Sequence, residues 1–440
     1  MLVVGYTTSN ISTGAYVSGP YVKIYKNTGT APYYNETDVI TNIPAWVNTN
    51  WAASNAVRQY TGNFAAWSKK DSKILVTGSD GTNKYSKLFK PDGLGGYAEI
   101  VNPVGGTTPF EGVIGYCGFG DFDADGDDDI LLYDTGLNTS TRALGYARVY
   151  RNDGADNYTL MTLNMPYTVQ NFYSIAISDT NGDGRDDIAI NGVYNLTSNT
   201  AANYRTALYT PDASMAFTEV IPKVAAANIR QIAYGAVAFI DTDGDGVASD
   251  IVMAGGQGNT TSARRFTLYK RNAAVPLTDD NAYTVEFDYA TTDGAFNAVG
   301  FQYGMIAVGD LSGTGKMKDF VSIGQRNSNS NRPYVGIKRT SGYTIYNNLE
   351  VTTNAAISSY NGNTAPNTSF FGNIINGGGS SVLRAYAIGD VDADGKADDL
   401  ATFALEYFGA ASLKVSSTLY VNDETVNSDN RPRVYRKSSK

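Results

Sequence analysis

Short runs in which apolar and polar residues alternate recur along the whole chain, and stretches rich in Gly, Asn, Ser and Thr separate them. The alternation in YSIAIS, GAVAFI, GMIAVG and RAYAIG has the period of two that predicts half-buried β-strands. An Asp-rich loop and then a second apolar run follow each of these strands. A third run ends in an aromatic residue and a turn, as in RVYRNDG from Arg148 and TLYKRN from Thr267, and leads into a fourth strand.

Four antiparallel strands in each unit, repeated about every 50 to 80 residues, indicate the blades of a β-propeller. Seven second strands predict an all-β, seven-bladed β-propeller of four-stranded antiparallel blades that forms a single domain over residues 1–440. The predicted blades cover roughly 1–60, 61–110, 111–168, 169–228, 229–298, 299–380 and 381–440. Because only six first strands are found, the first blade is incomplete, and we expect residues upstream of Met1 to supply its inner strand and loop.

The composition excludes several classes of enzyme. The chain has no His and a single Cys, Cys117, so a Ser-His-Asp triad, a Cys-His pair, a zinc site of Cys and His, and a disulfide within the chain are impossible. Cys117 lies in the alternating stretch GYCGFG, where we expect a small buried side chain. No apolar run is long enough to predict a membrane span, and no export signal is found in the chain.

Acidic residues are concentrated in five loops, each directly behind a first strand. These loops hold 21 of the 43 acidic residues and only four of the 34 basic ones, so the acidity behind the net charge of −9 is concentrated where divalent cations could neutralise it. In the loop from Asp121, carboxylates occupy relative positions 1, 3, 5 and 9, and Gly126 allows a sharp turn at position 6. Alternate residues of a tight loop point to a common centre, where oxygen ligands of this kind suit calcium. The sequence therefore predicts about three to four structural Ca2+ ions.

The predicted calcium ligands come from four of these loops. They are Asp121, Asp123, Asp125, Asp127 (carbonyl) and Asp129; Asp179, Asn181, Asp183, Arg185 (carbonyl) and Asp187; Asp241, Asp243, Asp245, Val247 (carbonyl) and Asp250; and Asp390, Asp392, Asp394, Lys396 (carbonyl) with either Asp398 or Asp399. The remaining loop predicts weak or no binding, because its candidate ligands Asp310, Ser312, Thr314 and Asp319 include only two carboxylates. An EF-hand needs an acidic ligand at position 12, where Leu132 stands in the first loop, so that motif is excluded.

The segments GDFDADGDDDIL, SDTNGDGRDDIA and GDVDADGKADDL resemble the repeats of the FG-GAP or VCBS family, which includes the propeller heads of integrin α subunits. The resemblance implies a calcium-binding propeller in which the ion lies in the hairpin between the first two strands of a blade and has a structural role. The chain departs from the family pattern in the missing inner strand of its first blade, in the degraded loop from Asp310, and in an extra loop residue in blades five to seven.

Function is expected on the opposite face, where the long connections lie. Aromatic residues there could contact a ligand: Trp46, Trp51, Phe110, Phe296, Tyr360, Phe370 and Phe371. The leading hypothesis is a recognition or adhesion module outside the cell, or at its surface, that binds a glycan or an extracellular protein and is not an enzyme. The alternatives are a structural subunit of a surface filament, with further domains or self-assembly, and a polysaccharide-active enzyme such as a lyase. One short basic run at the C-terminal end does not indicate nucleic-acid binding.

Overall fold

The computed structural model describes nineteen segments of the chain. These segments are residues 2–8, 18–27, 34–40, 64–68, 70–79, 83–113, 115–134, 146–161, 170–193, 204–256, 264–290, 302–311, 316–327, 330–339, 342–346, 385–389, 399–407, 413–422 and 434–438. All regular elements in these ranges are β-strands. A helix with the length and apolar character needed to cross a bilayer is absent from them.

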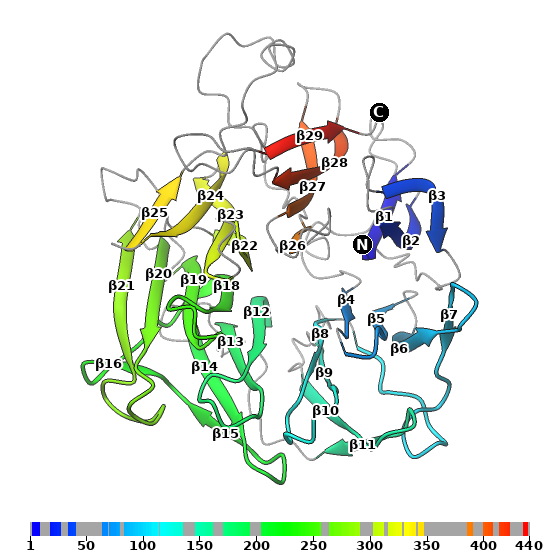
Figure 1. Cartoon of the computed structure of the whole chain (residues 1–440), viewed down its shortest axis with the longest axis horizontal. Coiled ribbons are helices and arrows are strands. Elements are labelled where there is room, and N and C mark those ends of the chain that lie inside the picture. Colours follow the sequence, from blue (N-terminus) through cyan, green and yellow to red (C-terminus); the bar gives the residue numbers. More distant parts are fainter. Residues whose placement is uncertain are drawn as a thin grey trace. The chain divides into compact units, whose positions relative to one another are not determined.

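Six four-stranded antiparallel sheets follow one another in the described part of the chain, and in each the strands pair in sequence order (Figure 1). The first three sheets are β4 (Phe64–Trp67), β5 (Ile74–Ser79), β6 (Lys84–Pro91) and β7 (Tyr97–Glu99); β8 (Cys117–Gly120), β9 (Asp129–Asp134), β10 (Tyr146–Asn152) and β11 (Tyr158–Met161); β12 (Gln170–Ser178), β13 (Asp187–Val193), β14 (Tyr204–Pro211) and β15 (Phe217–Val220). The next three are β18 (Ala233–Ile240), β19 (Asp250–Gly256), β20 (Arg264–Arg271) and β21 (Tyr283–Ala290); β22 (Gln302–Gly309), β23 (Asp319–Asn327), β24 (Ser330–Arg339) and β25 (Gly342–Tyr346); β26 (Ala385–Gly389), β27 (Asp399–Tyr407), β28 (Leu413–Asn422) and β29 (Val434–Ser438).

Two smaller sheets complete the described secondary structure. One is three-stranded and consists of β1 (Leu2–Thr8), β2 (Ser18–Asn27) and β3 (Tyr34–Ile40). The other is a hairpin of β16 (Lys223–Val224) and β17 (Ala227–Asn228), which the alternation of residues did not predict. The all-β class and the four-strand repeat are therefore confirmed. The number of blades and their closure into a propeller stay a prediction.

The chain divides into two compact units. Unit 1 consists of Met1–Ala233 with Asn272–Ala282, and unit 2 of Tyr234–Arg271 with Tyr283–Lys440. Each unit is described by itself below.

Successive sheets of unit 1 share hydrophobic cores. Alternate residues of β9 enter different cores, because successive side chains of a strand point to opposite faces. Ile130 and Leu132 pack with Leu75 and other residues of the sheet β4–β7, whereas Leu131 and Tyr133 pack with residues of β13 and β14. Both faces of the sheet β8–β11 are thus covered, which explains why all six residues of β9 are buried.

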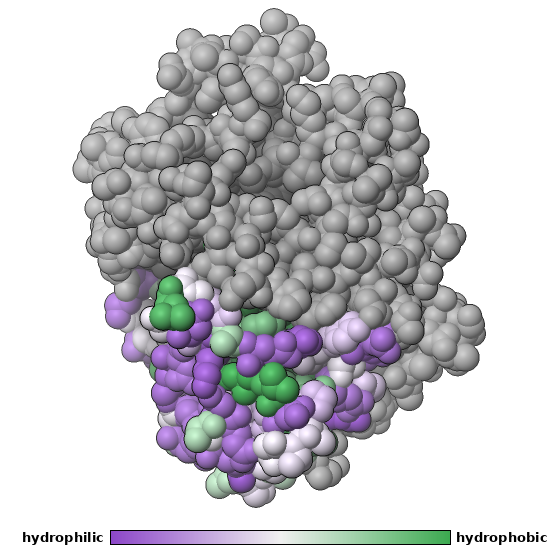
Figure 2. All heavy atoms as spheres, turned by 90° about the vertical axis from the view of Figure 1, so that its right-hand side faces the viewer, coloured by the Kyte–Doolittle hydropathy of each residue, from purple (hydrophilic) through white to green (hydrophobic). Residues whose placement is uncertain are grey.

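Cys117 belongs to the core between the sheets β4–β7 and β8–β11, as its sequence position predicted. Its thiol lies 3.7 Å from the carbonyl oxygen of Leu75, and burial raises the pKa of Cys117 to about 12. The outer surface of unit 1 differs from this core. Figure 2 shows mainly hydrophilic side chains among the described residues of the face it draws, with a few hydrophobic ones between them. Leu94 and Val101 are among the exposed hydrophobic residues of this unit.

Leu131→Ala tests the shared core of the sheets β8–β11 and β12–β15. Leu131 is completely buried, so we expect the variant to lower the free energy of unfolding by about 2–5 kcal/mol. Chemical denaturation measures this change. Leu94→Ala is the matched control, because Leu94 is 93% exposed and its removal should leave the stability nearly unchanged. Equal effects of the two substitutions would contradict the packing described.

Candidate metal centres

Each Asp-rich loop is the hairpin between the first and second strands of its sheet. In the first loop Gly120 pairs with Asp129, and in the last loop Gly389 pairs with Asp399. The last Asp of the loop is therefore also the first residue of the second strand. Of the two residues left open by the sequence, this register assigns Asp399, rather than Asp398, to the position that Asp129 holds.

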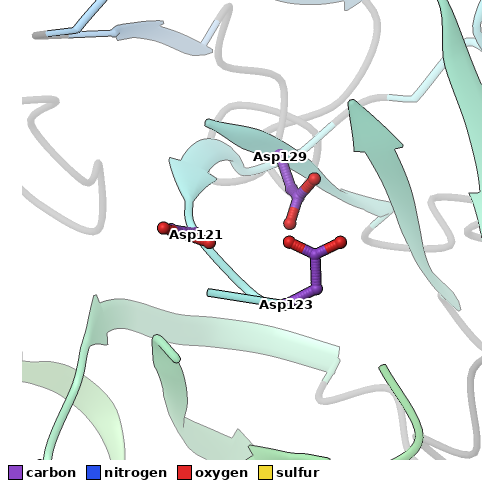
Figure 3. Close-up of side chains that lie close together, drawn as sticks. All are labelled: Asp121, Asp123 and Asp129. Atoms are coloured by element: carbon purple, nitrogen blue, oxygen red, sulfur yellow. The ribbon is translucent and has the colours of Figure 1, made fainter. Parts of the chain in front are cut away.

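The loop from Asp121 brings three of its predicted ligands together. One carboxylate oxygen from each of Asp121, Asp123 and Asp129 lies within 4.8 Å of the other two, and Figure 3 shows the carboxylates of Asp123 and Asp129 facing one another. Gly126 adopts a φ of +90°, as the predicted turn requires, and its N–H donates to Asp121 Oδ2 at 3.0 Å. Asp125 is exposed, and its Oδ1 accepts the N–H of Asp127 at 2.9 Å.

Asp129 joins three segments of its sheet. It is completely buried, and its Oδ2 accepts the N–H of Phe122 at 2.9 Å while its Oδ1 accepts the N–H of Asn152 at 2.8 Å. Asp250 has the same two bonds in unit 2, from the N–H groups of Thr242 at 3.0 Å and Arg271 at 2.6 Å. The last Asp of a loop thus fixes the start of that loop against the end of the third strand.

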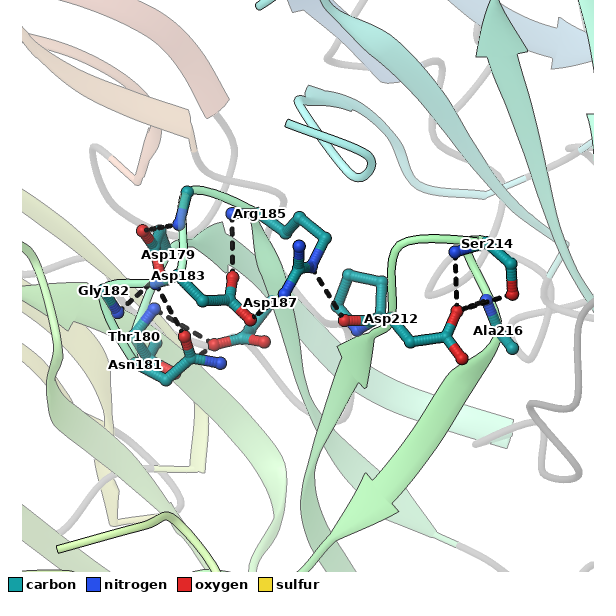
Figure 4. A network of polar contacts seen from close by, with 12 residues as sticks. Asp179, Thr180, Asn181, Gly182, Asp183, Arg185, Asp187, Asp212, Ser214 and Ala216 are labelled. Carbon is teal, nitrogen blue, oxygen red and sulfur yellow. Dashed lines mark hydrogen bonds and ion pairs between the residues drawn. The ribbon is translucent and has the colours of Figure 1, made fainter. Parts of the chain in front are cut away.

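The loop from Asp179 is closed by hydrogen bonds to its first carboxylate (Figure 4). Asp179 accepts the N–H groups of Gly182 at 2.8 Å, Asp183 at 3.2 Å and Gly184 at 2.9 Å. Asn181 Oδ1 accepts a further bond from the N–H of Asp183 at 2.9 Å. The loop is therefore folded around its own first carboxylate.

Arg185 places a positive charge inside this second loop. Its guanidinium group pairs with Asp183 Oδ2 at 2.5 Å and donates to the carbonyl of Pro211 at 3.2 Å (Figure 4). Only the carbonyl group of Arg185 was predicted to contribute. Its side chain holds one oxygen of Asp183, which a cation in this loop would have to share.

Asp187 differs from Asp129 because the third strand offers it no donor. The pairs Ile130–Tyr150 and Ile188–Tyr209 align the two sheets, and Pro211 then stands where Asn152 stands. Since proline has no N–H, Asp187 Oδ1 is buried without a hydrogen-bond partner, while Oδ2 is bonded to the N–H and hydroxyl groups of Thr180.

The loop from Asp241 in unit 2 resembles the first loop. Carboxylate oxygens of Asp241, Asp243 and Asp245 lie within 4.8 Å of one another. The predicted carbonyl ligand of Val247 accepts the N–H of Ser249 at 2.9 Å. Lys270 Nζ lies 3.7 Å from Asp243, so a cation here would compete with a lysine.

The two remaining predicted loops are described in part or not at all. Asp310 and Asp319 are buried, with exposed fractions of 2% and 0%, whereas Ser312 and Thr314 lie outside the described residues. The predicted ligands of the last loop that precede β27 also lie outside them: Asp390, Asp392, Asp394, Lys396 and Asp398. Asp399 is described only as a strand residue.

In the sheet β4–β7 a lysine replaces the last Asp of the loop. The N–H of Ser68 donates to the carbonyl of Lys73 at 2.9 Å, which closes a shorter hairpin in the same register. Lys73 Nζ lies 3.0 Å from Asp71 and 3.3 Å from Asp156, and donates to the hydroxyl of Tyr158 at 3.4 Å. This hairpin therefore contains its own cation, which explains why it needs no carboxylate-rich loop.

Burial and the repulsion of neighbouring carboxylates raise the pKa of three Asp residues in the first two loops. Burial, together with the charges of neighbouring Asp residues, raises the pKa of Asp129 and of Asp187 to about 7. The same causes raise the pKa of Asp127 to about 6. Hydrogen bonds from Phe122 and Asn152 oppose the shift at Asp129 without cancelling it.

These donors fit a hard divalent cation. Asp121 Oδ1, Asp127 Oδ1 and Asp187 Oδ1 are all buried without a hydrogen-bond partner, a condition that a bound ion would relieve. The donors are oxygens, as calcium and magnesium require, and calcium accepts a more variable coordination geometry than the strict octahedron of magnesium.

Of the seven aromatic residues predicted to contact a ligand, only Phe110 lies in the described part of the chain. Its exposed fraction is 4%, and its ring packs edge to face against Tyr150 at 4.8 Å and Tyr158 at 5.3 Å between centroids. Phe110 therefore belongs to the core and offers no ring face to a ligand. The other six lie outside the described residues: Trp46, Trp51, Phe296, Tyr360, Phe370 and Phe371.

Comparison with known families agrees with this geometry over two of the loops. The model of the FG-GAP-like repeat matches residues 121–190, which begin at the first Asp of one loop and end in β13. Residues 121–190 are therefore similar to an FG-GAP-like repeat. The resemblance drawn from the Asp-rich segments is thus confirmed for this part of the chain.

More distant comparisons give weak similarities. A search among curated proteins finds no match. Among solved structures, AofleA from Arthrobotrys oligospora is 10% identical, with 87% of each chain covered and a TM-score of 0.41. The biofilm matrix protein Bap1 of V. cholerae is 10% identical, with 98% of this chain and 85% of that chain covered and a TM-score of 0.33. A family GH43 β-1,3-galactosidase is 8% identical, with coverages of 72% and 96% and a TM-score of 0.34. Similarity at this level assigns no function.

The raised pKa values predict how pH affects the metal-free protein. A carboxyl with a folded-state pKa near 7 and an unfolded pKa near 4 binds more protons when folded between these values, so the free energy of unfolding should fall as pH rises from about 4 to 7. Denaturation of metal-stripped protein at several pH values in this range measures the slope. Asp129→Asn should reduce it, and excess calcium should abolish it. Equal slopes with and without calcium would show that the cation does not neutralise these groups.

Proposed function

We propose that this chain is a calcium-stabilised β-propeller that acts outside the cell, or at its surface, as a recognition or adhesion module. The observation that carries the calcium part is the set of buried carboxylate oxygens without partners in the first two loops. An ion that binds only the folded chain would neutralise them and stabilise the fold. The structural role follows from Asp129, whose carboxylate also holds the loop against the third strand.

The recognition role rests on the opposite ends of the sheets. Asn152 ends β10 beside the Asp loop, so Tyr146, the first residue of β10, lies at the other end and pairs there with Asp134. The Arg148 guanidinium lies 4.3 Å from the centroid of the Tyr146 ring and donates to Glu111 at 2.7 Å. Arg148 and Glu111 remain partly exposed, so this cluster forms an ordered polar surface of the kind that recognises glycans or proteins.

The same cluster favours binding over catalysis. A lyase without histidine would need Tyr, Lys or Arg as its base. Burial, a hydrogen bond to Glu111 and the charge of Asp134 raise the pKa of Tyr146 above its ordinary range, so its phenol keeps its proton and is a poor base. The Lys84 ammonium group is engaged in an ion pair with the buried carboxylate of Asp134 at 2.5 Å.

Removal of calcium tests the structural part of the proposal. Chelation should lower the melting temperature by several degrees or more, because stabilisation by bound ligand is lost by mass action, and added calcium should restore it. Magnesium at equal concentration serves as the control and should restore less. A melting temperature that does not respond to chelator would contradict structural calcium.

A binding screen tests the recognition part. Full-length protein is screened against immobilised glycans and extracellular matrix proteins, and Arg148→Ala is compared with Arg151→Ala on the best ligand. Arg151 lies on the same strand near the Asp loop and is paired with Asp153 at 2.7 Å, so it matches Arg148 in charge and pairing. We expect roughly tenfold weaker binding for Arg148→Ala only. New unsaturated or reducing ends on a polysaccharide would instead identify an enzyme, and self-assembly without ligand a filament subunit.

A further inference from the structure

Asp186 connects the first two Asp-rich loops of unit 1. Its Oδ2 accepts the N–H of Asp121 at 2.9 Å, and its own N–H donates to the carbonyl oxygen of Asp121 at 2.7 Å. Both main-chain groups of Asp121, the first predicted ligand of one loop, are thus held by a residue of the next loop. Asp186 directly precedes Asp187, the predicted ligand at the start of β13.

Asp128 occupies the corresponding position in the preceding loop and likewise contacts the hairpin of the sheet before its own. Its Oδ2 accepts the hydroxyl of Ser68 at 2.6 Å. Ser68, however, belongs to the short hairpin that Lys73 closes, which has no set of carboxylates. The two residues therefore share a position and a type of contact, but only Asp186 joins two acidic loops.

In unit 2 the first Asp of a loop, Asp241, is held by a main-chain group of the following loop and not by a side chain. The N–H of Asp241 donates to the carbonyl oxygen of Met317 at 3.3 Å. In each unit the first Asp of one loop is thus held by the following loop. Between Asp121 and Asp186 this contact consists of two hydrogen bonds, one of which is accepted by the Asp186 side chain.

We propose that Asp186 makes cation binding by the loops 121–129 and 179–187 cooperative. The inference rests on the proposed binding of calcium by these loops. A cation in the loop 179–187 orders the segment that carries Asp186, so Asp121 is already positioned when a second cation binds the loop 121–129. The entropy cost of ordering this contact therefore falls on the first binding step alone. Reciprocity requires the same gain in the opposite direction.

The variants of Asp186 separate its side-chain bond from its main-chain bond. Asp186→Ala removes the acceptor for the N–H of Asp121 and leaves the main-chain bond to the carbonyl oxygen of Asp121. Asp186→Asn keeps an acceptor oxygen on the side chain and therefore keeps both bonds.

Calorimetric titration of the metal-stripped full chain with calcium tests the proposal. Asp241, Asp310 and Asp390 are changed to Ala in all samples, so that the titration reports on unit 1. With Asp186 present, the isotherm should be steeper than that of independent sites. Asp186→Ala should remove this steepness and weaken the second binding step on the order of fivefold, the lower end of usual coupling between sites.

Asp128→Ala is the matched control. It removes a carboxylate at the same loop position, but its partner hairpin has no cation site, so cooperativity should persist. Unchanged cooperativity in Asp186→Ala would overturn the proposal, and so would an equal loss in Asp128→Ala. If Asp186→Ala does not fold, Asp186→Leu, which also lacks the acceptor oxygen, decides, since a coupling equal to that of the parent would also overturn the proposal. Absence of calcium binding by the parent would instead contradict the proposed function itself.

Discussion

The buried carboxylate at the start of the second strand is the interaction on which the sheets β8–β11 and β18–β21 depend. Asp129 and Asp250 each accept one N–H from the loop and one from the third strand, so a single side chain fixes the hairpin and three strands of its sheet. A carboxylate in such a place is costly when ionised, as the pKa of Asp129 near 7 indicates. The acidic loop beside it adds repulsion, and a divalent cation is the simplest group that removes both costs at once.

Two hairpins differ from this arrangement, and in both the difference lies in how the charge at the start of the second strand is balanced. The hairpin of Lys73 replaces the carboxylate by an ammonium group and surrounds it with Asp71, Asp156 and the hydroxyl of Tyr158. At Asp187 the donor from the third strand is lost because Pro211 has no N–H, and one buried oxygen is left without a partner. These hairpins differ in how charge at the strand start is balanced, while the register of their strands is retained.

Much of the fold could be predicted from the sequence, because a strand pattern of period two and a repeated Asp loop are local signals. The six first strands and the position of Asp129 followed from alternation and spacing alone. The role of Asp186 could not be predicted, because the contact joins residues from two sheets and no spacing encodes it. Phe110 was misplaced for a similar reason, since an aromatic residue in a long connection gives no sign of the tyrosines that cover it.

The proposed cation sites lie at one end of the sheets of unit 1, and a polar surface in which Tyr146 and Glu111 order Arg148 lies at the other. Elemental analysis of full-length protein after gel filtration in calcium buffer tests most directly whether the loops hold calcium. About three to four calcium ions should remain with each chain, and the double variant Asp121→Ala with Asp123→Ala should retain about one fewer. A calcium content below one ion per chain would contradict the account.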